Sequence, residues 1–138
     1  MAQKIIEVAD LKKYYNGGAV HAMDGVTVDI CRGDVIAVIG PSGGGKSTFL
    51  RCMNLLEKTS SGQILFNGVD ICAKDQSKYI DQHRQKMGMV FQQFNLFNNM
   101  TVMKNLTAAP VRIKGMDKKQ AEDKAIELLG RVGLADRA

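Results

Sequence analysis

One stretch of the sequence constrains the fold more than any other: an apolar run that leads into a glycine-rich segment and then into a helical pattern. Val35–Ile39 is apolar throughout, and Gly40–Gly45 follows it directly. An unbroken apolar run bounded by turn residues is typical of a strand covered on both faces, so we expect Val35–Ile39 at the centre of a sheet. Apolar residues then recur at the spacing of a helix that buries one side, at Phe49, Cys52, Met53 and Leu56. The sequence therefore predicts a strand, a loop and a helix in succession, and hence an α/β fold.

The loop has the composition of a phosphate-binding loop. Glycines let successive backbone N–H groups approach phosphate oxygens, because no side chain intervenes and positive φ costs little. The helix that begins near Lys46 adds unpaired N–H groups and the positive end of its dipole. We expect the Lys46 ammonium to contact the β and γ phosphates of a nucleotide and the Ser47 hydroxyl to coordinate Mg²⁺. The Walker A pattern G-x-x-x-x-G-K-[ST] is carried by Gly40, Pro41, Ser42, Gly43, Gly44, Gly45, Lys46 and Ser47, with Thr48 next.

Composition and charge exclude several other classes of protein. The chain has 138 residues, of which 45% are hydrophobic and 24% charged, and this balance is typical of one globular domain rather than a disordered chain. The formal net charge of +5 favours an anionic partner. The basic residues are scattered, with Lys12-Lys13 and Lys118-Lys119 as the densest runs, so we expect no nucleic-acid partner.

The sequence also lacks the patterns of membrane-spanning, secreted and metal-binding proteins. No apolar run approaches the ~20 residues of a membrane helix, and the first residues lack the apolar stretch of a signal peptide, so we expect neither a membrane span nor secretion. Cys31, Cys52 and Cys72 lack C-x-x-C spacing, which favours a reducing cytosol over a disulfide framework or a zinc site. His21 and His83 have no ligand partners at metal spacing, and we expect both to be surface or packing residues.

Shorter patterns predict the remaining elements. Arg32-Gly33-Asp34 and Asn67-Gly68 predict tight turns. Asp117 can cap a helix, with Gln120 three positions later, and Gly133 would end it. We expect the buried side of that helix to consist of Ala121, Ala125, Leu128 and Leu129. We expect four further strands at Ile5–Val8, Val26–Ile30, Ile64–Phe66 and Met87–Phe91.

The sequence around the loop indicates which class of phosphate-loop protein this chain resembles. A GTPase needs N-K-x-D and D-x-x-G motifs, and neither occurs. Small-molecule kinases usually carry the loop almost at the N-terminus, whereas here a strand-rich segment precedes it. The sequence instead resembles the nucleotide-binding subunit of ATP-binding cassette (ABC) transporters, and within them the importers of polar amino acids. The matching segments are LKKYYNGG, VIAVIGPSGGGKSTFLRCMNLLE, SSGQILFNGVDI, GMVFQQFNLF and RVGLADRA.

This resemblance implies a fold and a set of site residues. It implies a P-loop NTPase (RecA-like) α/β core with an antiparallel β subdomain over residues 1–100, followed by the start of a helical subdomain over residues 101–138. It places Tyr15 on the adenine base, with Tyr14 as the alternative. It makes Gln92 the Q-loop glutamine that contacts Mg²⁺ and the attacking water, with Gln93 as the alternative. It puts phosphate or Mg²⁺ contacts on Ser42, Gly43, Gly44, Gly45, Lys46, Ser47 and Thr48.

The resemblance also implies parts that these residues do not contain. The family's L-S-G-G-Q signature opens a helix. Ser60-Ser61-Gly62-Gln63 looks similar but precedes an expected strand, so we do not interpret it as the signature. The dipeptide Asp-Glu does not occur, so the Walker B aspartate and the catalytic glutamate have no counterpart. We therefore expect a cassette truncated before its signature and Walker B, which binds ATP with Mg²⁺ but does not hydrolyse it.

The resemblance also implies binding partners and a location in the cell. The partners would be a second cassette, membrane permease subunits and, indirectly, a substrate-binding protein, with the chain at the inner face of the cell membrane. Lys104 stands where the family often carries a glutamate in a capping box, and this weakens the case for the permease contact. Two alternatives stay open: a non-catalytic nucleotide-binding or regulatory fragment, and a cassette for another cargo such as phosphate or lipoprotein.

Overall fold

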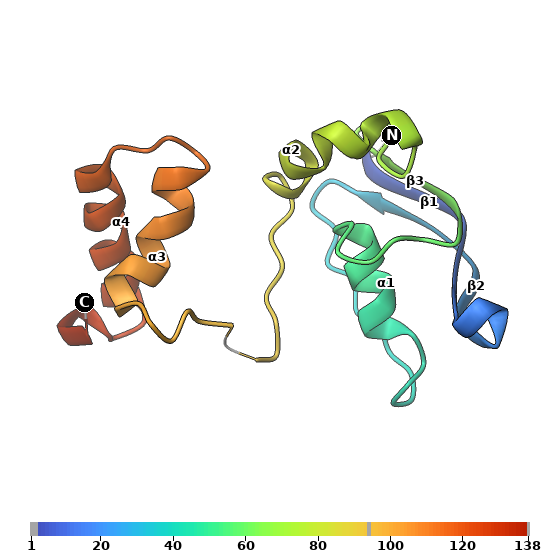
Figure 1. Ribbon diagram of the computed structural model, residues 1–138, viewed down its shortest axis with the longest axis horizontal. Helices are drawn as coiled ribbons and strands as arrows, with labels where there is room; N and C mark the ends of the chain where they lie inside the picture. Colours follow the sequence, from blue (N-terminus) through green and yellow to red (C-terminus); the bar gives the residue numbers. More distant parts are fainter. Residues whose placement is uncertain (1–2, 94, 138) are drawn as a thin grey trace. The chain divides into compact units, whose positions relative to one another are not determined.

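The chain folds into two compact units. The computed structural model describes residues 3–93 and 95–137 (Figure 1). The first unit is Met1–Val90 and contains the sheet and the glycine-rich loop. The second unit is Phe91–Ala138 and is helical.

The first unit is built on an antiparallel sheet with the strand order β2-β1-β3-β4 (Figure 1). The strands expected at Ile5–Val8, Val26–Ile30 and Ile64–Phe66 are confirmed, and all three extend further than the sequence predicted. The strands are β1 Lys4–Tyr15, β2 Val20–Cys31, β3 Ser61–Phe66 and β4 Val69–Asp70, paired β1 with β2, β1 with β3 and β3 with β4.

Side-chain alternation decides which face of the sheet is buried. In β2, Val26, Val28 and Ile30 are half-buried, whereas Thr27 and Asp29 between them are exposed, as their alternating polarity predicted. The turn between β3 and β4 is also confirmed. Its two residues have the positive φ angles of a tight hairpin turn, which asparagine and glycine adopt most readily: Asn67 at 50° and Gly68 at 79°.

Helix α1, Lys46–Met53, covers the buried face of this sheet. Its Cys52 and Met53 are buried, and Phe49 packs against the same cluster, as the sequence predicted. Leu56 was expected to join them but is 45% exposed. The helix has ended by then, and Leu55, with φ of 55°, packs against the core in its place. The buried residues of this core are Val8, Leu11, Met23, Cys52, Met53, Ile64 and Ile71.

The expected central strand at Val35–Ile39 is wrong for this structure. The segment has no regular structure, and Val35 is 99% and Ile39 90% exposed. A strand forms only where a neighbouring strand supplies partners for its N–H and C=O groups, and the described strands pair only with one another. The expected strand at Met87–Phe91 is irregular too, with Val90 98% exposed. The apolar pattern marks segments suited to burial, but burial requires a partner.

Short helices complete the first unit. A single turn, η1 Asn16–Gly18, links β1 to β2. The predicted turn at Arg32-Gly33-Asp34 is present, and the Asp34 carboxylate accepts a hydrogen bond of 2.7 Å from the Cys31 N–H. After β4 the chain forms η2 Lys74–Tyr79 and α2 Ile80–Arg84.

The second unit pairs two helices, α3 Val102–Arg112 and α4 Lys118–Arg131, and ends in η3 Ala135–Arg137. The predicted cap of α4 is confirmed, because the Asp117 carboxylate accepts hydrogen bonds from the N–H groups of Lys119 at 3.0 Å and Gln120 at 3.3 Å. The predicted helix end is also confirmed, since Gly133 follows α4 with φ of 73°.

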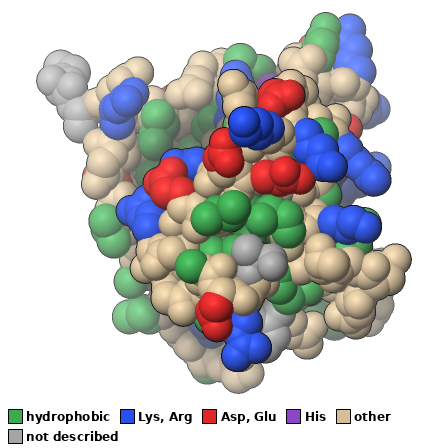
Figure 2. Space-filling model, turned by 90° about the vertical axis from the view of Figure 1, so that its left-hand side faces the viewer, with side chains coloured by type: hydrophobic (Ala, Val, Ile, Leu, Met, Phe, Trp, Pro, Cys, Tyr) green, Lys and Arg blue, Asp and Glu red, His purple; other side chains and the backbone are tan. Residues whose placement is uncertain are grey.

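The buried side of α4 is narrower than the sequence predicted. Ala121, Ala125 and Leu129 are buried, but Leu128 is 42% exposed. Several large apolar side chains of this unit face solvent, and Figure 2 shows apolar side chains gathered on one surface with charged ones around them. These exposed residues include Leu96, Phe97, Ile113, Ile126, Val132 and Leu134.

Candidate functional site

The glycine-rich loop is fixed at its end by contact with the sheet. Gly45 precedes the first residue of α1 and has φ of 78°. A Cβ atom at this position would lie 2.1 Å from the carbonyl oxygen of Ala22 in β2, which is backbone and cannot rotate away. Only glycine therefore fits, both in conformation and in space. This close approach places the N-terminus of α1 directly against β2.

The Lys46 side chain bends back over the loop. Its ammonium donates hydrogen bonds to the carbonyl oxygens of Gly40, at 2.9 Å, and Pro41, at 2.7 Å. The loop is itself closed by the Gly44 N–H, which donates to the Pro41 carbonyl at 3.1 Å. A positive charge is thus held beside the loop backbone, next to the N-terminus of α1.

The charge at this helix start favours an anion. Helix α1 has no acidic residue in its first turn, so its positive end is not neutralised from within the helix. Gly43 has φ of 78°, a conformation that turns the backbone between the exposed Ser42 and α1. The Ser47 hydroxyl lies on an exposed residue of the first turn, and Thr48 is half-buried. The predicted loop residues are therefore brought together around one helix N-terminus.

The donor set fits a nucleotide phosphate and its magnesium ion. Backbone N–H groups, the helix end and one ammonium suit phosphate oxygens, and Ser47 offers a neutral oxygen suited to Mg²⁺. Gly43, whose added Cβ would meet nothing within 4 Å, leaves the loop backbone open to close approach. Within residues 3–93 and 95–137, no cluster of three or more His, Cys, Asp or Glu side chains could hold a metal ion.

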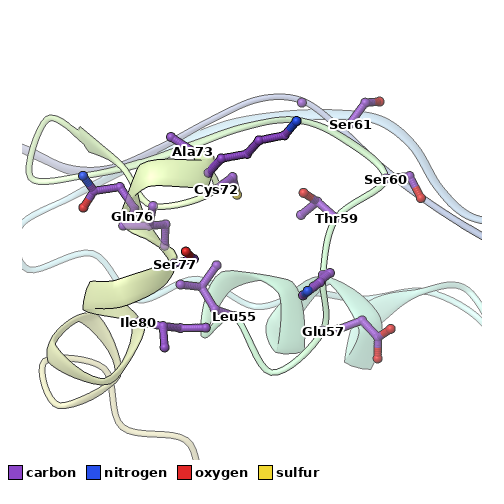
Figure 3. A pocket seen from close by; sticks show the side chains of 14 residues that line it. Leu55, Glu57, Thr59, Ser60, Ser61, Cys72, Ala73, Gln76, Ser77 and Ile80 are labelled. Carbon is purple, nitrogen blue, oxygen red and sulfur yellow. The ribbon is translucent and has the colours of Figure 1, made fainter.

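An apolar groove of about 430 Å³ runs beside the loop. Gly44, Gly45 and Lys46 form one part of its wall, and apolar residues of β2 and of 36–39 form most of the rest. A second cavity, of about 680 Å³, lies between the segment after α1 and the η2–α2 region (Figure 3). No loop residue lines this second cavity.

The two neighbouring tyrosines of β1 differ in their surroundings. The Tyr14 ring stacks on His21, with the ring centroids 4.1 Å apart and the planes at 28°. Its hydroxyl donates a hydrogen bond to the Asp24 carboxylate, and this bond is the main reason that the pKa of Tyr14 is raised. The same bond lowers the pKa of Asp24. Tyr14 is therefore occupied by contacts within the β1–β2 hairpin.

Tyr15 lies on the other face of β1, because successive residues of a strand point to opposite sides. It shares its face with Lys13 and the fully buried Leu11, and that face is covered by α1. The Lys13 ammonium lies 4.6 Å from the centroid of the Tyr15 ring. Burial raises the pKa of Cys52 in α1 to about 11, and the nearby Lys13 charge opposes this rise. Tyr15 is half-buried on the side of the sheet that carries the loop.

Gln92 and Gln93 belong to the second compact unit, whereas the loop belongs to the first. Both glutamines are exposed and lie in a bend of the chain. Phe94, which follows them in the matched GMVFQQFNLF segment, lies outside the described residues.

The sequence analysis did not identify three residues that contact predicted site residues. Two of them, Lys13 and Glu57, lie beside Tyr15, and the third, Ala22, lies beside Gly45. Lys13 could have been found, because a residue two positions away in a strand shares the face of Tyr15. Glu57, which pairs with Lys13 at 2.8 Å, follows α1 and carried no signal in the sequence, since its contact depends on how α1 packs on the sheet. Ala22, which meets Gly45, is a small strand residue with no pattern to mark it.

Comparison with known proteins identifies the family. A family model described as ABC transporter matches residues 23–138. This chain belongs to the ABC transporter family. It is 44% identical to the histidine/lysine/arginine/ornithine transport ATP-binding protein HisP of Salmonella typhimurium, over 100% of the chain and 56% of HisP. It is 40% identical to the glutamine transport ATP-binding protein GlnQ of Escherichia coli, over 97% of the chain and 54% of GlnQ. The chain spans about half the length of these relatives.

Solved structures of ABC cassettes confirm the fold class. The dimeric, post-hydrolysis structure of the ATP-binding cassette MJ0796 bound to ADP and Pi matches with a TM-score of 0.81 and 27% identity, over 91% of this chain and 56% of that one. The structure of cbiO1 from Clostridium perfringens, part of the ABC transporter complex cbiONQ, matches with a TM-score of 0.76 and 30% identity, over 98% of this chain and 53% of that one. The chain thus has the α/β P-loop fold of an ABC cassette, as the sequence predicted.

Across the described part of the ABC chain, no helix is both long and apolar enough to cross a membrane.

Proposed function

We propose that the chain is the N-terminal part of the ATP-binding subunit of an ABC importer, which couples ATP binding and hydrolysis to the uptake of polar amino acids. The observation that carries this proposal is the loop at the start of α1, where Gly45 is pressed against Ala22 and Lys46 holds a positive charge over the backbone. The relatives support the cargo class, since HisP and GlnQ are both named as amino acid transport ATP-binding proteins.

In this proposal the loop binds the phosphates of Mg²⁺-ATP. Backbone N–H groups of residues 42–48 and the Lys46 ammonium hold the phosphate oxygens, and Ser47 binds Mg²⁺, which neutralises phosphate charge when it is present.

Tyr15 stacks on the adenine base, a role that Tyr14 is poorly placed to fill because His21 covers its ring. Gln92 is the proposed Q-loop residue that contacts Mg²⁺ and the attacking water. In this proposal, residues 1–100 form the nucleotide-binding core and residues 101–138 begin a helical subdomain.

The proposed setting is that of the family. The whole protein would pair with a second cassette, a proposal supported by the dimeric form of MJ0796. It would also contact membrane permease subunits at the inner face of the cell membrane and serve a substrate-binding protein through them. The names of HisP and GlnQ as transport proteins support this assignment.

We expect the 138-residue chain to bind ATP without hydrolysing it. Phosphoryl transfer requires a positioned water and a neutralised transition state, and the chain has no Asp-Glu pair to supply Walker B and a catalytic base. Turnover assays alone and with a full-length cassette separate this proposal from a purely regulatory nucleotide-binding role.

The decisive test is calorimetric titration of the chain with ATP in the presence of Mg²⁺. Lys46→Ala should weaken binding by at least about tenfold, because it removes charge-assisted contacts with phosphate. Lys86→Ala, at an exposed lysine of the same unit, should leave binding unchanged. Equal affinities for the wild type and Lys46→Ala would contradict the proposed site.

A further inference from the structure

A shielded ion pair lies beside Tyr15. The Lys13 ammonium and the Glu57 carboxylate are 2.8 Å apart, and their side chains are 12% and 29% exposed. Among the ion pairs within the described residues, this pair is the least exposed; Lys4–Asp29, for comparison, is 48% exposed on both sides. An ion pair held away from solvent keeps a defined geometry better than a solvated one.

Glu57 sets the position of the Lys13 ammonium. The hydrogen bond from Lys13 is the main reason that the pKa of Glu57 is lowered, and the Tyr15 side chain makes a smaller contribution in the same direction. Figure 3 shows the Glu57 side chain directed away from Gln76 and Ile80, on the opposite side of the second cavity. Glu57 lines that cavity, and its carboxylate is paired with Lys13 of β1.

The Lys13 ammonium in turn fixes the Tyr15 ring. It lies 4.6 Å from the ring centroid, within the range of a cation–π interaction. Lys13 and Tyr15 are two residues apart on one strand and so point to the same side. The ring thus has a cation at one position on its surface, held there by Glu57 after α1. A planar base could stack only on the part of the ring that Lys13 leaves free.

We infer that Lys13, held by Glu57, is a positioning residue that orients the Tyr15 ring for stacking on the adenine base. This inference rests on the proposed function, in which Tyr15 meets adenine. A ring whose orientation is already fixed loses less conformational freedom when the base binds, so the pair raises affinity through the base and not through the phosphates.

The test compares two ligands that share phosphates but not the base. Affinities for Mg²⁺-ATP and for inorganic triphosphate are measured on the wild type, Lys13→Met, Glu57→Gln, Lys13→Arg and Tyr15→Ala. Lys13→Met should weaken ATP binding by about threefold to tenfold and leave triphosphate binding unchanged, while Lys13→Arg should keep most of the affinity because it restores a cation over the ring. Glu57→Gln should have a smaller effect in the same direction as Lys13→Met.

Two controls separate positioning from other roles. Lys12→Met changes the neighbouring lysine, which pairs with Asp10 on the opposite face of β1, and should leave both affinities unchanged. In a Tyr15→Ala background, Lys13→Met should cause no further loss, because the residue on which it acts is gone. If Lys13→Met does not fold, Glu57→Gln and Lys13→Arg carry the same comparison.

The outcomes distinguish this inference from the proposed function. Equal losses of ATP and triphosphate affinity in Lys13→Met, or an additive loss in the Tyr15→Ala background, would overturn the positioning role while leaving the nucleotide site intact. Failure of the wild type to bind either ligand would instead overturn the proposed function itself.

Discussion

Gly45 shows how a single backbone position determines the shape of the loop. The sequence analysis explained the loop glycines by their close approach to phosphate and their tolerance of positive φ. The contact of Gly45 with the Ala22 carbonyl depends instead on how β2 and α1 pack, which no local pattern encodes. The same holds for Lys13 and Glu57, since one lies in β1 and the other after α1. Residue types at the loop were thus predictable, whereas their neighbours across the fold were not.

Gly45→Ala should destabilise the first unit by more than the ordinary cost of a positive φ, which is about 1–3 kcal/mol for a non-glycine residue. The added Cβ would also collide with backbone 2.1 Å away. Gly33→Ala is the matched control, because Gly33 has φ of 90° but nothing within 4 Å of an added Cβ. Urea unfolding measures both, and equal losses would show that the clash with Ala22 is not present.

The Lys13–Glu57 pair should make stability depend on pH in the acid range. The folded-state pKa of Glu57 lies below its ordinary value of 4.5. The ionised carboxylate therefore stabilises the fold above pH 4.5, and this contribution is lost as the pH falls below 4.5. Glu57→Gln should show a smaller fall in Tm than the wild type between about pH 5 and about pH 3. Glu127→Gln, at the 54% exposed partner of Lys124, is the control. If Tm fell as much in Glu57→Gln as in the wild type, the proposed role of the pair would be refuted.

At the scale of elements, local chemistry predicted boundaries better than partners. The cap of α4, its glycine end and the Asn67-Gly68 turn were all predicted, because each depends on residues close in sequence. The strand at Val35–Ile39 was not formed, because a strand depends on a neighbour that sequence spacing cannot supply. Leu128 was misplaced because it lies at the edge of the buried side of α4.

Asp117→Ala should lower the stability of the second unit by about 1 kcal/mol, since it removes the acceptor for the N–H groups of Lys119 and Gln120. Asp123→Ala, at an exposed position inside α4, should cost little. The loss of helical circular dichroism on urea unfolding reports both variants. A cost for Asp123→Ala as large as that for Asp117→Ala would contradict the capping role.

At the scale of the whole molecule, the apolar segments around the loop face solvent. Val35 and Val90 are 99% and 98% exposed. The chain spans about half the length of HisP and GlnQ, and the exposed segments are apolar enough to be buried in a larger sheet. We expect the 138-residue chain to self-associate as its concentration rises.

Val35→Thr and Val90→Thr should reduce this self-association and change the free energy of unfolding by less than about 0.5 kcal/mol each, because neither side chain is packed. Val8→Thr, at a side chain 1% exposed, should cost about 1–3 kcal/mol. Light scattering and urea unfolding measure the two effects. A large loss of stability in Val35→Thr would mean that this segment is packed in solution.

The central claim is that main-chain amides at the start of α1, together with Lys46, hold the phosphates of a nucleotide. The most direct measurement is the change in backbone amide NMR shifts when Mg²⁺-ATP or inorganic triphosphate is added. The account predicts large changes for Gly43–Thr48 with both ligands, and their loss in Lys46→Ala. Changes confined to other residues, or none at saturating ligand, would contradict it.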